Sequence, residues 1–177
     1  MRTLRVMAVA ASALVVLGAS GSAVMAQMDA DADAVYVTVE TTPLESDAGT
    51  MSEVDALYSS RDGVGTYTNE ASDPRVSGTS TIFWNVDVDR DTGQGIMWGT
   101  AHLENDGGTW EGPWTGMEYE PGDNDYFTTS GWLVGDGDYA GYTFYFQLDA
   151  FQYGGPIRMH HGIIFKGQPP VPEPPAE

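Results

Sequence analysis

The sequence contains no cysteine, and this absence excludes several kinds of protein at once. Disulfide bridges, thiolate metal sites and cysteine nucleophiles are ruled out, and so is a lipid-modified cysteine behind an export signal. Basic residues are also scarce, because 7 Lys and Arg stand against 26 Asp and Glu, for a formal net charge of −19. Such a charge repels phosphate backbones, so nucleic acid is not expected as a partner. It indicates either simple solubility outside the cell or adaptation to high salt.

Motifs that carry chemistry are missing as well. Gly-x-Ser-x-Gly and the phosphate-cradling Gly-Lys-Ser/Thr do not occur, and no Ser-His-Asp arrangement can be identified. Asp87, Asp89 and Asp91 have the alternating spacing of a calcium loop, but Gly93 comes one position late and Trp98 stands where a bidentate Glu is expected. A hairpin turn whose Asp side chains cap backbone groups is the simpler interpretation.

The three histidines do not form a recognisable metal motif. If residues 157–165 form a strand, His160 and His161 point to opposite faces and cannot chelate one ion as neighbours. A joint site of His102 with one of this pair would depend on proximity in the folded chain. We therefore predict no metal and no cofactor.

Three glutamates on neighbouring expected strands are the candidates for acid–base chemistry. Buried inside a barrel, Glu104, Glu111 or Glu118 would have a raised pKa and could act as a general acid or base. The alternative is that all three are solvated, outward-facing charges, since acidic side chains are seldom buried without a partner.

The chain begins with the pattern of an export signal. Arg2 and Arg5 precede an apolar run, Val6–Leu17, and small residues follow up to Ala26. This run is shorter than the roughly 20 residues that span a bilayer. We predict a signal peptide over residues 1–26, secretion, and no membrane association after cleavage. Loss of both arginines would change the formal charge from −19 to −21, which is 5 basic minus 26 acidic residues.

The rest of the chain divides into three parts. Residues 27–34 are small and acidic and are expected to form a flexible leader. Residues 35–167 are expected to form one β domain. Residues 168–177 contain five prolines, so we expect an extended, disordered tail.

Short alternating segments separated by Asp, Asn and Gly turns fill the predicted domain. They predict strands over residues 35–40, 63–69, 81–89, 95–104, 109–119, 127–134, 139–148 and 157–165. Pro43 is expected to end the first strand, and Thr41–Ser60 to form a long loop or a short helical turn. The pattern indicates an all-β antiparallel meander. Glycines within the strands favour its closure into a barrel of about eight strands, with a β-sandwich as the alternative.

Several glycine-rich aromatic segments carry a resemblance to known proteins. The chain resembles a group of uncharacterised secreted bacterial proteins at Ala71–Thr79, Met97–Thr100, Gly107–Gly116, Gly135–Tyr142 and Gly162–Phe165. Its strands are also similar to the eight-stranded barrel of the allene oxide cyclases and of calycin-type proteins. The resemblance implies a barrel fold. It implies no activity, because none of the cyclases' functional residues can be matched here and one fold hosts unrelated functions.

The abundant aromatic residues are expected either to fill a barrel core or to line a cavity. We predict a non-enzymatic barrel that binds a small apolar or aromatic ligand or has a structural role. The alternatives are a cyclase- or isomerase-like enzyme with its site inside the barrel, and an extracellular interaction module. In the last predicted strand, the face of Ile157, Met159, His161, Ile163 and Phe165 is taken as the inner one. The predicted cavity residues are Trp84, Trp98, Trp110, Tyr142, Phe144 and His161.

Overall fold

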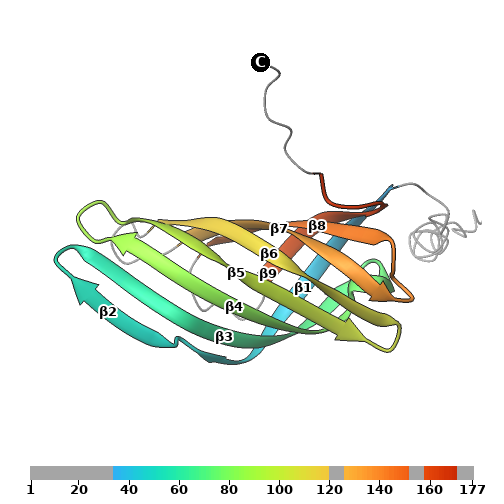
Figure 1. The fold of residues 1–177 in the computed structure, drawn as a ribbon, viewed down its shortest axis with the longest axis horizontal. Helices are drawn as coiled ribbons and strands as arrows, with labels where there is room; N and C mark the ends of the chain where they lie inside the picture. Colours follow the sequence, from blue (N-terminus) through green and yellow to red (C-terminus); the bar gives the residue numbers. More distant parts are fainter. Residues whose placement is uncertain (1–33, 120–125, 152–157, 171–177) are drawn as a thin grey trace, which may run out of the picture. The chain divides into compact units, whose positions relative to one another are not determined.

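Nine β-strands and one short 3-10 helix make up the described part of the chain. The computed structural model describes residues 34–119, 126–151 and 158–170. The elements are β1 (Ala34–Asp47), β2 (Thr50–Val54), β3 (Leu57–Ala71), η1 (Pro74–Val76), β4 (Gly78–Asp89), β5 (Gln94–Asn105), β6 (Gly108–Tyr119), β7 (Tyr126–Gly137), β8 (Tyr142–Phe151) and β9 (Arg158–Lys166) (Figure 1). The predicted signal peptide, nearly all of the leader and most of the tail lie outside the described residues. No helix in the described ranges has the length and apolarity that crossing a membrane requires.

The strands close into a ring. Each strand from β3 to β9 pairs antiparallel with the next one in sequence, and β1 pairs antiparallel with both β3 and β9. Eight strands therefore form a continuous barrel, to which β2 adds as a short strand on β3. This arrangement confirms the predicted all-β antiparallel meander of about eight strands, and one continuous sheet replaces the two sheets of the sandwich alternative.

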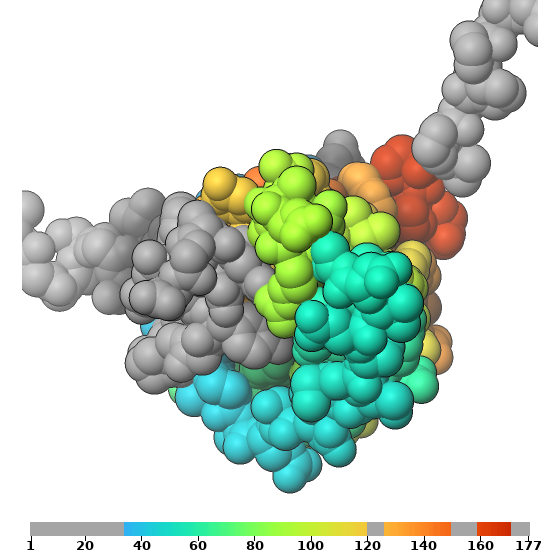
Figure 2. Space-filling model, turned by 90° about the vertical axis from the view of Figure 1, so that its left-hand side faces the viewer, coloured from blue at the N-terminus to red at the C-terminus, as the bar shows by residue number. Residues whose placement is uncertain are grey.

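The region Thr41–Ser60 differs from the prediction, because it is neither a long loop nor a helical turn. β1 continues through Pro43, where the pairing with β3 shifts register between Pro43 and Glu45. A bulge tolerates proline because the ladder is already interrupted there. The β2–β3 hairpin then lies beside the turn between β4 and β5, as Figure 2 shows, and the amide of Arg90 donates to the carbonyl of Ala56 at 2.8 Å.

Aromatic rings alternate with glycines around the middle of the barrel interior. One row of directly paired residues crosses all eight strands of the ring and consists of Gly63, Trp84, Gly99, Trp114, Gly131, Phe146, Gly162 and Val37. A methyl group on Gly63 would lie 2.2 Å from Nε1 of Trp84. Strand glycines thus leave the space that rings on neighbouring strands occupy.

Candidate ligand cavity

A cavity of about 110 Å³ lies inside the ring of strands. All eight ring strands contribute to its wall, and η1 contributes Val76. The apolar part of the described lining consists of Val39, Tyr67, Val76, Ile82, Trp84, Met97, Ala101, Leu103, Trp114, Phe127, Leu133, Phe144, Phe146 and Leu148. The cavity is smaller than the roughly 300 Å³ at which pockets for drug-sized ligands begin. An apolar cavity of about 150 Å³ is known to hold benzene, so this one suits a molecule of about one small ring.

A few polar side chains interrupt the apolar wall. The hydroxyl of Thr41 donates to Oδ1 of Asn69 at 2.7 Å across the β1–β3 pair. Ser80, Thr129 and His160 complete the polar part of the described lining. No Lys, Arg, Asp or Glu is among the described lining residues. Because an unpaired charge in such a space would be strongly disfavoured, the cavity fits a neutral molecule.

Trp114 is a lining residue with a buried hydrogen-bond donor. The ring is buried on the inner face of β6, and its Nε1 has no hydrogen-bond acceptor among the described residues. An indole N–H can only donate. Trp114 is therefore a lining residue whose polar atom the fold leaves unsatisfied.

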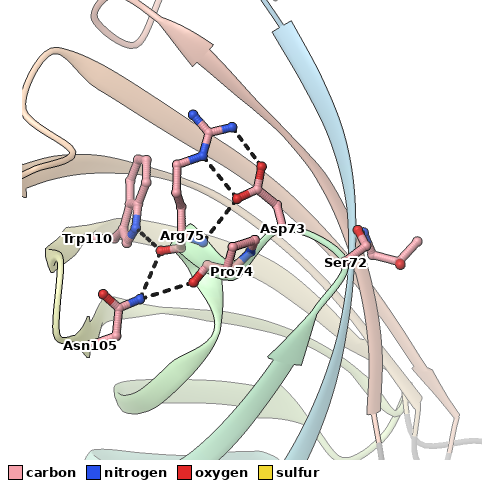
Figure 3. A network of polar contacts seen from close by, with 7 residues as sticks. Ser72, Asp73, Pro74, Arg75, Asn105 and Trp110 are labelled. Atoms are coloured by element: carbon pink, nitrogen blue, oxygen red, sulfur yellow. Dashed lines mark hydrogen bonds and ion pairs between the residues drawn. The ribbon is translucent and has the colours of Figure 1, made fainter. Parts of the chain in front are cut away.

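One end of the barrel is filled by the η1 turn. Val76 is fully buried there, and Trp110 is 0 % exposed. Nε1 of Trp110 donates to the carbonyl of Arg75 at 2.7 Å, and Nδ2 of Asn105 donates to the same carbonyl at 3.2 Å (Figure 3). The ring of Trp110 also stacks on that of Tyr139, with centroids 5.2 Å apart. At this end the interior is packed and its polar groups are paired.

An ion pair holds the η1 turn. Oδ1 of Asp73 accepts hydrogen bonds from the amide and Nε of Arg75, both at 3.0 Å, and Oδ2 accepts from its NH2 group at 2.7 Å. Burial raises the pKa of Asp73, but the hydrogen bonds and charge of Arg75 outweigh it, so the pKa lies below its ordinary value. The hydrogen bonds that Arg75 donates to Asp73 in turn raise the pKa of Arg75, against an opposing effect of burial.

The six predicted cavity residues fall into three places. Trp84 and Phe144 line the cavity. Trp110 and Tyr142 lie at the η1 end, where the guanidinium of Arg75 is 5.5 Å from the ring centre of Tyr142. Trp98 lies on the outer face of β5, with the guanidinium of Arg61 5.1 Å from its ring centre.

The sixth predicted residue, His161, lies on the outside of the barrel. Its ring stacks on Tyr36, which is largely exposed. The inner face of β9 instead carries His160, Gly162 and Ile164. The expectation that His161 shares the inner face therefore differs from the structure by one residue, which in a strand exchanges the two faces. The prediction that His160 and His161 point to opposite faces agrees with it.

Sequence reasoning missed several lining residues, above all Trp114, Phe146 and His160. A signal for each was present. Trp114 and Phe146 share a face with the predicted Trp110 and Phe144, and His160 shares a face with Gly162. Since glycines alternate with rings inside this barrel, Gly162 identifies the inner face of β9. The more apolar face proved to be the outer one, where Met159 and Ile163 are exposed.

The three candidate glutamates lie on different faces of the barrel. Glu104 and Glu111 are exposed on the outer face, where they flank His102 at 3.7 and 4.0 Å. Glu118 is buried on the inner face of β6. It is not one of the described residues that line the cavity. The described residues contain no cluster of three or more His, Asp and Glu that could hold a metal ion.

The aspartates with calcium-like spacing form a hairpin turn. Oδ1 of Asp89 accepts hydrogen bonds from the amides of Asp91 and Thr92 at 2.9 and 3.3 Å. Asp87 instead accepts from the hydroxyl of Ser59 and from Arg61, each at 2.6 Å. Burial raises the pKa of Asp87, yet these two partners bring it below its ordinary value. Asp89 thus caps backbone amides as the turn interpretation predicted, whereas Asp87 is held by side chains of β3.

Comparison with protein-family models, with curated proteins and with solved structures finds no match to this chain.

Proposed function

We propose that this protein is an exported carrier or sensor that binds a small, neutral, largely apolar molecule inside its barrel. The observation that carries the proposal is the cavity of about 110 Å³, with an aromatic and aliphatic wall drawn from all eight ring strands. Binding of apolar molecules is driven by removal of their surface from water, and a preformed cavity reduces the ordering cost. Export rests on the signal-like residues 1–26.

Native mass spectrometry of the protein purified from its own source tests this proposal. A reproducible extra mass on the order of 100 daltons, lost on denaturation, is expected for a ligand of about one ring. A bare mass, together with no uptake of small apolar probes such as benzene or xenon by the protein, would contradict the proposal. Substituting Ala101→Leu should fill space in the cavity and abolish uptake, whereas Thr100→Leu on the exposed outer face of the same strand is the matched control.

A second candidate function is catalysis, and one observation favours it. Glu118 is buried on the inner face of β6, four residues beyond Trp114. A cyclase or isomerase would use such a carboxylate as a general acid or base. The test follows the ligand found by mass spectrometry: it should be converted by the wild-type protein and only bound by Glu118→Gln. Unchanged ligand in both proteins would leave binding as the function.

A further inference from the structure

We propose that the ligand carries a hydrogen-bond-accepting oxygen, which the indole N–H of Trp114 binds. This inference rests on the proposed function, since it names the chemistry of a molecule in the same cavity. It predicts a ketone, aldehyde, lactone or ether in place of a pure hydrocarbon.

The first step is the burial of Trp114. Its side chain is more than nine-tenths buried and lines the cavity, and Nε1 has no acceptor among the described residues. Buried polar groups in folded proteins are nearly always hydrogen-bonded, and each exception calls for an explanation. The indole group has no lone pair to offer, so only an incoming acceptor satisfies it.

Trp110 and Trp114 lie on the same strand but differ in their hydrogen-bond partners. Trp110 is four residues from Trp114 and faces the same interior, yet its N–H reaches the Arg75 carbonyl at 2.7 Å. The fold therefore supplies an acceptor to a buried tryptophan at the packed end. At the cavity, Trp114 instead has glycines on both sides, since it pairs with Gly99 on β5 and with Gly131 on β7. The ring is accommodated there, and the fold supplies no acceptor among the described residues for its buried N–H.

The lining of the cavity also indicates that the ligand is neutral. The described lining offers no Lys or Arg to neutralise a carboxylate or phosphate. The chain's net charge of −19 also disfavours the approach of anions. A neutral oxygen is therefore the acceptor that fits. Water alone is a poorer occupant, because a buried water needs two to four polar partners and most of this wall is apolar.

The test compares two probes of nearly the same shape. Cyclohexanone carries the acceptor oxygen, and methylenecyclohexane replaces that oxygen with a CH₂ group. We expect the ratio of ketone affinity to alkene affinity to be about five- to tenfold higher in wild-type protein than in Trp114→Phe, which is the contribution of one hydrogen bond. The indole N–H resonance of Trp114 should move downfield with the ketone and respond little to the alkene.

Two variants complete the experiment. In Trp114→Phe the ketone-to-alkene ratio should fall by that factor while both probes still bind. Trp98→Phe, which changes a ring on the outer face, should keep the wild-type ratio. The same ketone-to-alkene ratio in wild-type protein and in Trp114→Phe, with no selective shift of the Trp114 resonance, would overturn this inference and leave the proposed function standing. Binding of neither probe would overturn both. The resonance shift is measured on wild-type protein, so the inference stays testable if Trp114→Phe fails to fold.

Discussion

Two tryptophans on β6 divide the barrel interior into two regions. Around Trp110 the η1 turn fills the space, and the indole N–H, the Asn105 amide and the Asp73–Arg75 pair are joined in one hydrogen-bonded network (Figure 3). Around Trp114 there is an apolar cavity and an indole N–H without an acceptor among the described residues. Two residues of the same type, on one strand and one face, thus differ in whether the fold supplies an acceptor. Burial alone therefore does not decide whether an indole N–H is satisfied, and the segment that packs against it does.

The largest expected effect is at the packed end. Trp110→Ala removes a fully buried ring and should lower the free energy of unfolding by about 3–5 kcal/mol. Urea denaturation followed by circular dichroism measures it. Trp98→Ala on the outer face is the matched control, with an expected loss of about 1 kcal/mol. A loss at Trp110 no larger than that at Trp98 would contradict the assignment of Trp110 to the core.

A smaller effect is expected where glycine accommodates a ring at the level of the cavity. In Gly63→Ala the new methyl group would lie 2.2 Å from Nε1 of Trp84, so the indole must move. We expect a loss of about 1–3 kcal/mol, which is typical of overpacking. The double variant Gly63→Ala, Trp84→Leu should show a coupling energy, because the smaller side chain relieves the clash. Additive losses would contradict direct contact between the two residues.

The ion pair at the packed end predicts a pH dependence. The pKa of Asp73 in the folded protein lies below its ordinary value of 3.8, so its stabilising effect is present above that value and disappears as the pH falls through the folded-state pKa. Asp73→Asn should therefore cost about 1–2 kcal/mol at pH 7 and progressively less below pH 3.8. Asp91→Asn, at an exposed turn position, is the control. A cost at Asp73 that stays constant with pH would argue against the ion pair.

The smallest effect tests the comparison directly. Trp110→Phe leaves one donor fewer on the Arg75 carbonyl and should cost about 1 kcal/mol or more. Trp114→Phe removes a donor that has no acceptor among the described residues, so without ligand its cost should be smaller or even negative. Thermal and urea unfolding of the two variants in parallel measure the difference. The reverse order of costs would show that Trp114 is satisfied in the free protein.

Much of the fold could be predicted because antiparallel strands are local in sequence. Alternation in Thr81–Asp89 and Tyr139–Leu148 and the Asp, Asn and Gly turns between segments indicated a meander. The error in Thr41–Ser60 arose because Pro43 normally breaks a strand, and the bulge that admits it is a property of the pairing with β3.

The candidate site could be predicted only in part. Trp84 and Phe144 lie on the cavity, but His161 lies on the outer face because hydrophobicity is a poor guide to the inner side of β9. Met159 and Ile163 are exposed while His160 is inside. Glycine position was the better guide, since interior rings need the space that glycine leaves.

The strand-rich class, the strongly negative net charge and the exclusion of every cysteine-based site could all be predicted from the sequence alone. Those properties depend on composition and on contacts between neighbours along the chain. Folding of the whole chain, by contrast, brings Trp110 to the Arg75 carbonyl and Trp114 to the cavity. The physical reason is separation along the chain. The acceptor for the buried Trp110 indole comes from a residue 35 positions away, and the closure of eight strands determines which interior groups come into contact.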